Sequence, residues 1–182
     1  MRTRRISCTV AALAALVAGC GGPAAPSEEA VAWTDQVCDA LSGFTRAATT
    51  SPQINRGDPV AAVQELDRYL GATSDELQRS LTALDGVGSS PVDGGDDYVG
   101  RLEEALLRIR GGFDAARTQL ATVDVSDPAQ FATAVPAALA PLQELRNLAA
   151  PTEGMRASEE LGAASEQAGN CRQLRATTTP AG

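Results

Sequence analysis

The feature that most constrains the fold of this chain is a run of apolar residues between positions 99 and 123. Its members follow one another at spacings of three or four: Val99, Leu102, Leu106, Ile109, Phe113, Ala116, Leu120 and Val123. Such spacings place side chains on one face of an α-helix, whereas a strand would alternate at every second residue. We therefore expect a long amphipathic helix, capped at its start by Asp96 or Asp97.

Four other stretches show the same helical period and begin with a capping residue. Their expected starts are Ser27, Asp58, Ser126 and Thr152. The second should run for about 26 residues and is weakest at Gly71, because glycine disfavours helix. Pro136 and Pro141 should kink or split the fourth. The fifth should carry a narrow apolar strip, namely Met155, Leu161, Ala164, Ala168 and Cys171.

No stretch shows sustained alternation of β-branched and aromatic residues, so we expect an all-α fold. Short loops between helices with heptad-like apolar seams are typical of an antiparallel bundle, here of four to five helices. We expect one domain over residues 27–175. Residues 176–182, ATTTPAG, should form a disordered tail.

The opening stretch has the composition of an export signal. Arg2, Arg4 and Arg5 precede an apolar run from Cys8 to Val17 that is too short to span a bilayer. The stretch closes on Val17, Ala18, Gly19 and Cys20. The alternatives are an ordinary signal peptide cut elsewhere and an uncleaved helix.

The residues Val17-Ala18-Gly19-Cys20 resemble the lipobox of bacterial lipoprotein precursors. This resemblance implies removal of residues 1–19 and attachment of diacylglycerol to Cys20, so that residues 20–26 form a lipidated tether. Two acyl chains anchor a protein stably. We therefore expect the domain on the extracytoplasmic face of the cell membrane, held there by lipid.

Two cysteines, Cys38 and Cys171, remain after Cys8 leaves with the signal and Cys20 is lipidated. In an exported chain such a pair most simply forms a disulfide, with free buried thiols as the alternative. On the chain-entropy account, a bridge closing so long a loop stabilises a domain by at most about 5 kcal/mol. It would join the first helix to the last and close the bundle.

The charged residues argue against several functions. Without residues 1–19 the chain keeps 12 arginines and 23 acidic residues, a formal charge of -11, which disfavours nucleic acid as a partner. The chain has no histidine and no lysine, so common general bases and nucleophiles are missing. We expect no catalytic residue, no metal site and no cofactor.

Two features could indicate a ligand-binding site but have simpler explanations. The loop from Asp85 to Asp97 holds several acidic residues and glycines that could bind calcium, yet its spacing does not match an EF-hand loop and suits capping and turns. Trp33 could line a pocket, but on a helical apolar stripe it should belong to the core.

The sequence therefore predicts a non-catalytic lipoprotein with an interaction or structural role in the cell envelope. Its expected partner is an envelope protein or a cell-wall polymer. The alternative is a helical carrier or co-receptor for a small molecule or lipid, if Pro136, Pro141 and Gly111-Gly112 open a cavity between helices. An enzyme working with carboxylates alone is a third reading.

Overall fold

A computed structural model describes residues 25–55, 57–147, 154–156 and 158–178. The regular secondary structure of this part is entirely helical, with six helices and no strand. The helices are α1 (Glu28–Thr49), α2 (Pro59–Asp85), α3 (Gly95–Leu120), α4 (Pro128–Asn147), α6 (Glu159–Gln167) and α7 (Gly169–Thr178). The all-α expectation is confirmed for these residues.

The first two helices begin where the capping residues predicted. The hydroxyl of Ser27 accepts a hydrogen bond from the backbone N–H of Ala30 at 3.1 Å. Asp58 accepts one from Ala61 at 3.0 Å, and Pro59 is the first residue of α2. Each cap satisfies an N–H that the helix itself leaves without a partner.

The start of α3 differs from expectation. Gly94, with φ +76°, is the N-cap residue, and no side chain caps the helix. Asp96 is already engaged, because its carboxylate accepts the backbone N–H of Ser90 at 2.7 Å. The expected capping by Asp96 or Asp97 was therefore wrong: the left-handed backbone of a glycine starts this helix.

The fourth helix is not divided by its prolines, since α4 runs continuously from Pro128 to Asn147 through Pro136 and Pro141. Asp127 caps it by accepting the backbone N–H of Ala129 at 2.9 Å. Of the two outcomes expected of these prolines, a kink or a split, the split did not occur.

The expected fifth helix is two helices. Ala168 adopts an extended conformation (φ -63°, ψ 128°) between α6 and α7. Because α7 continues to Thr178, Ala176 and the two residues after it are helical, although we expected them in the tail. Residues 179–182 lie outside the described residues.

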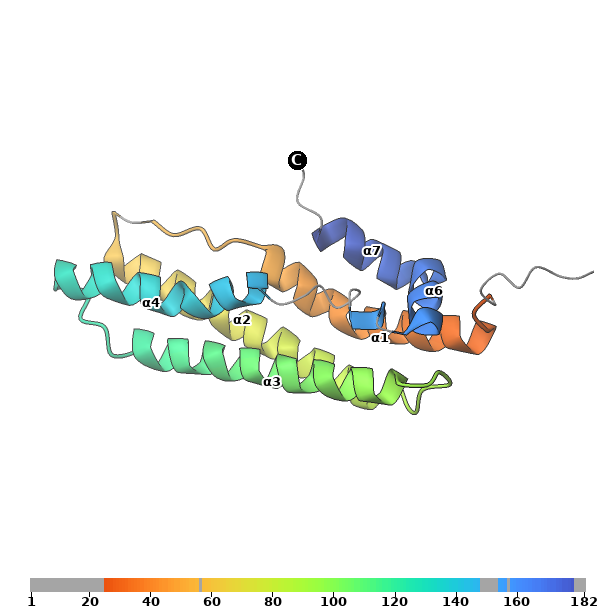
Figure 1. Ribbon diagram of the computed structural model, residues 1–182. Helices are drawn as coiled ribbons and strands as arrows, with labels where there is room; N and C mark the ends of the chain where they lie inside the picture. Colours follow the sequence, from red (N-terminus) through yellow and green to blue (C-terminus); the bar gives the residue numbers. More distant parts are fainter. Residues whose placement is uncertain (1–24, 56, 148–153, 157, 179–182) are drawn as a thin grey trace, which may run out of the picture.

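From α1 to α4, helices that are neighbours in the sequence are also in contact, and one further set of contacts is long-range. α2 contacts α1 and α3, and α3 contacts α4. From α1 to α4 the chain reverses direction at each connection (Figure 1). The long-range contacts are those of the C-terminal pair, because α6 and α7 lie against α1, the first helix of the described part (Figure 1).

The core is built from the predicted apolar faces. Leu66, Leu70 and Leu77 of α2 and Phe113 of α3 are fully buried. All five apolar residues expected on the last strip are buried as well. Within the described residues, no helix combines the length and apolar character needed to cross a membrane.

Candidate functional site

The two cysteines of the predicted bridge meet between α1 and α7. Cys38 and Cys171 form a disulfide with a Cα–Cα distance of 5.0 Å, across 133 positions of sequence. Both residues are fully buried. The predicted disulfide is thus present and joins the first described helix to the last, whereas Cys20, the predicted lipidation site, lies outside the described residues.

A second long-range link lies next to the bridge. Asp35 accepts hydrogen bonds from the backbone N–H of Asn170 at 2.7 Å and from its side-chain amide at 2.9 Å. Because Asn170 is the second residue of α7, the Asp35 carboxylate sits at the positive end of that helix. Sequence reasoning missed this link, since nothing in the local pattern relates positions 35 and 170.

Two arginines of α7 hold the corner between α6 and α7. The guanidinium of Arg175 donates to the backbone carbonyl of Ser165 at 2.9 Å, and that of Arg172 donates to the carbonyls of Glu166 and Gln167. These carbonyls belong to the last turn of α6, where the helix supplies no partners of its own. The arginines therefore supply hydrogen-bond donors to the end of α6 and stabilise the turn between α6 and α7.

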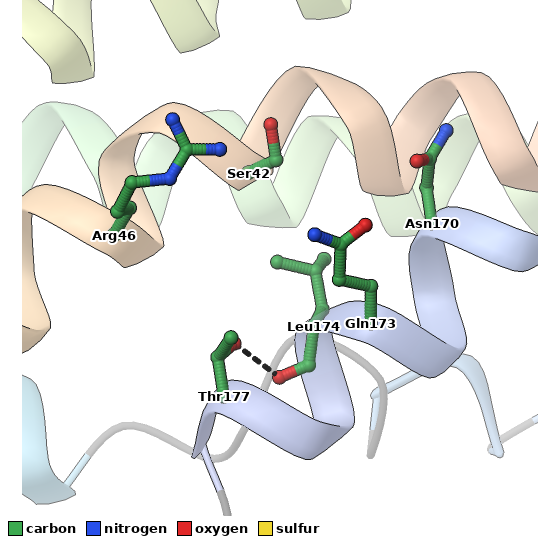
Figure 2. A pocket seen from close by; sticks show the side chains of 6 residues that line it. All are labelled: Ser42, Arg46, Asn170, Gln173, Leu174 and Thr177. Carbon is green, nitrogen blue, oxygen red and sulfur yellow. Dashed lines mark hydrogen bonds between the residues drawn. The ribbon is translucent and has the colours of Figure 1, made fainter.

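A small pocket lies along the contact between α1 and α7. It is lined by Ser42 and Arg46 of α1 and by Asn170, Gln173, Leu174 and Thr177 of α7. Figure 2 shows the side chains of Gln173 and Leu174 pointing from α7 toward α1. The hydroxyl of Thr177 donates to the carbonyl of Leu174 at 2.8 Å.

The size of this pocket decides what it can hold. Its volume is about 30 Å³. Such a space takes one or two water molecules or the tip of a side chain, whereas drug-sized ligands occupy cavities of about 300 Å³ or more. The pocket therefore does not favour a carrier of larger molecules.

An open groove lies at the other end of the same contact. Its volume is about 360 Å³, and it is formed by Pro26, by the start of α1, including Val31 and Asp35, and by residues 167–169 at the corner. The contact between α1 and α7 is thus incompletely filled on both sides of the disulfide.

The acidic loop is held by hydrogen bonds within it and by one hydrogen bond to α1. Besides Asp96, the loop uses Gly88, whose carbonyl accepts a hydrogen bond from the indole N–H of Trp33 at 3.1 Å. Trp33 is only 5% exposed, which confirms it as a core residue. Among the described residues, no three His, Cys, Asp or Glu side chains are grouped so that they could hold a metal ion.

The pKa shifts in the described part have structural causes. Burial raises the pKa of Tyr98, partly offset by Arg101, and burial also raises the pKa of Tyr69. The Arg79 guanidinium, hydrogen-bonded to Glu76, lowers the pKa of that carboxyl. These shifts follow from packing and from neighbouring ion pairs on the helix surface.

The chain was compared with protein-family models, curated proteins and solved structures, and no match was found.

Proposed function

We propose that this chain is a membrane-anchored extracytoplasmic lipoprotein with a non-catalytic interaction or structural role in the cell envelope. The observation that carries the proposal is the order of features at its start: three arginines, a short apolar run and the lipobox-like residues ending in Cys20. The diacylglyceryl group on Cys20 is the anchor.

The disulfide between Cys38 and Cys171 supports the extracytoplasmic location. Disulfides form and persist mainly outside the reducing cytosol. The chain from Cys20 to Ser27, where α1 is capped, extends at most about 25 Å. The anchor therefore keeps the domain close to the bilayer.

We further propose that the helices form an antiparallel bundle closed by the disulfide. The contacts between α1 and α2, α2 and α3, and α3 and α4 support this arrangement, as does the position of α7 on α1. Its polar connections between helices include the ion pair between Arg117 and Asp67 at 2.9 Å and the hydrogen bond from Ser74 to Asp114 at 3.1 Å.

A non-catalytic role agrees with the available side chains. The whole chain lacks histidine and lysine, and two of its four cysteines are bridged. The role left for the domain is to present a folded, acidic surface at a fixed distance from the membrane. Its partner is an envelope protein or a cell-wall polymer, not a nucleic acid.

Intact-mass measurement on protein purified from its host's membranes tests the anchor. The expected mass is that of residues 20–182 plus a diacylglyceryl group. Because of the disulfide, this mass should be lower by two hydrogens than the mass measured after reduction. A mass without lipid, or one beginning at another residue, would overturn the proposal and indicate a freely secreted domain.

A further inference from the structure

The helices α6 and α7 are attached to the rest of the fold mainly through α1. Their main contacts in the described part are with α1 and with each other. Besides Cys171, α7 buries one apolar side chain, Leu174, while α6 buries Leu161 and Ala164. A helix of ten residues is marginal in water unless packing supports it. The C-terminal pair therefore depends on its packing against α1, with Ala168 between the two helices also buried.

The face of α1 beneath α7 contains a polar defect. Thr34 precedes Cys38 by one turn, so the two side chains lie on the same face. The Thr34 hydroxyl is the one buried side-chain polar atom in the described part that lacks a hydrogen-bond partner. An unsatisfied buried hydroxyl weakens the packing around it. Together with the pocket and the groove on either side, it leaves the bridge and the hydrogen bonds between Asp35 and Asn170 as the main connections across this contact.

We propose that the Cys38–Cys171 disulfide is a redox-controlled clasp. When it is reduced, α6 and α7 leave α1, while α1, α2 and α3 stay folded on one another. A dithiol supplies two electrons and two protons, becomes a disulfide itself, and leaves Cys38 and Cys171 as thiols. Opening uncovers the face of α1 that carries Thr34 and Cys38, both fully buried in the closed form.

Access to the bridge is part of the proposal. Because both cysteines are fully buried, a reductant reaches the sulfur atoms only when the contact between α1 and α7 opens locally around the intact bridge. The rate of reduction therefore measures how often this contact opens. The proposal concerns the disulfide alone and holds whether or not Cys20 carries lipid.

Hydrogen exchange of the full chain in detergent, before and after treatment with dithiothreitol, tests the clasp. After reduction, amides of α6 and α7 should exchange at least 100-fold faster, while those in the middle of α2 and α3 change less than threefold. Unchanged protection of α6 and α7 would overturn the proposal. Equal loss of protection in α2 and α3 would also overturn it, because the bridge would then hold the whole domain.

The double variant Cys38→Ala/Cys171→Ala repeats the test without a reductant. It should show the same pattern as the reduced protein, with fast exchange confined to α6 and α7. Protection of these helices equal to that in the oxidised parent would contradict the clasp.

The rate of reduction provides a second measurement. Thr34→Val replaces the unsatisfied hydroxyl with a methyl group, so the contact should open less often and dithiothreitol should reduce the bridge about tenfold more slowly. Thr73→Val is the matched control, because that buried hydroxyl donates to the carbonyl of Tyr69 at 2.9 Å and lies in α2. It should not slow reduction. Reduction of Thr34→Val at the parent rate would show that opening of α7 does not admit the reductant, and would overturn the proposal.

Discussion

Asp35 and Asn170 are joined by hydrogen bonds to both carboxylate oxygens although 135 positions separate them in the sequence. The bond to the backbone N–H caps α7, and the bond to the side-chain amide fixes the direction in which α7 leaves its corner. The start of α7 is thus positioned by a side chain of α1.

Removing this carboxylate should destabilise the domain. Asp35→Ala leaves two donors of Asn170 without their partner, and we expect a loss of about 2 kcal/mol in the free energy of unfolding, measured by urea denaturation. Asp39→Ala is the control, because Asp39 is an exposed acid on the same helix. An equal loss in both variants would mean that charge, and not the link to Asn170, is responsible.

The indole N–H of Trp33 should contribute to the stability of the acidic loop. Trp33→Phe keeps an aromatic ring in the core but leaves the carbonyl of Gly88 without its donor. We expect the free energy of unfolding to fall by about 1–3 kcal/mol, with faster hydrogen exchange in residues 86–94. Unchanged exchange in this loop would show that the hydrogen bond does not hold it.

Two substitutions on α3 distinguish its buried face from its exposed face. Phe113→Ala should cost about 3–5 kcal/mol, because Phe113 is fully buried and its truncation leaves a cavity. Leu107→Ala should change the stability by less than about 0.5 kcal/mol, since Leu107 is 53% exposed. Chemical denaturation measures both, and similar costs would contradict the orientation of α3.

Alkaline pH should destabilise the domain through Tyr98. Burial raises its pKa from 10.0, so the unfolded chain loses the phenolic proton at lower pH than the folded one does. Stability is therefore complete below about pH 10 and falls as the pH rises above that value. The chain has no lysine that would obscure this effect. Tyr98→Phe should reduce the alkaline loss, followed by denaturation at pH 8 to 11, and a fall equal to that of the parent would contradict this assignment.

Cys20→Ala should release the protein from membranes without unfolding it, because the proposed lipid cannot attach to alanine. Fractionation of host cells measures the release, and circular dichroism checks the fold. Cys8→Ala is the matched control and should remain with the membranes. A Cys20→Ala variant that still sediments with membranes would contradict the lipid anchor.

Local signals in the sequence predicted the starts of α1 and α2. Asp58 and Pro59 marked the start of α2 because capping and proline geometry act within a few residues. Gly71 did not interrupt that helix. A Cβ atom on Gly71 would lie 3.2 Å from the guanidinium carbon of Arg117 in α3, so the two helices are in close contact here. This contact offsets the low helix propensity of glycine.

The errors arose where side-chain hydrogen bonds outside the helical pattern decide the local structure. Ala168 has no helix-breaking character, and the corner at this position depends on Arg172 and Arg175 from the next helix. Asp96 looked like a cap, but Ser90 of the folded loop occupies its carboxylate. The disulfide was predictable because cysteines are few, whereas the link between Asp35 and Asn170 was not.

The position of Cys171 has a consequence for the order of assembly. Contacts among α1, α2 and α3 join helices that follow one another, and they can form while later segments are still being synthesised. The partner of Cys38 emerges only after 132 further residues have been made. Throughout that interval the Cys38 thiol has no access to its correct partner, so it is open to wrong pairing during biogenesis.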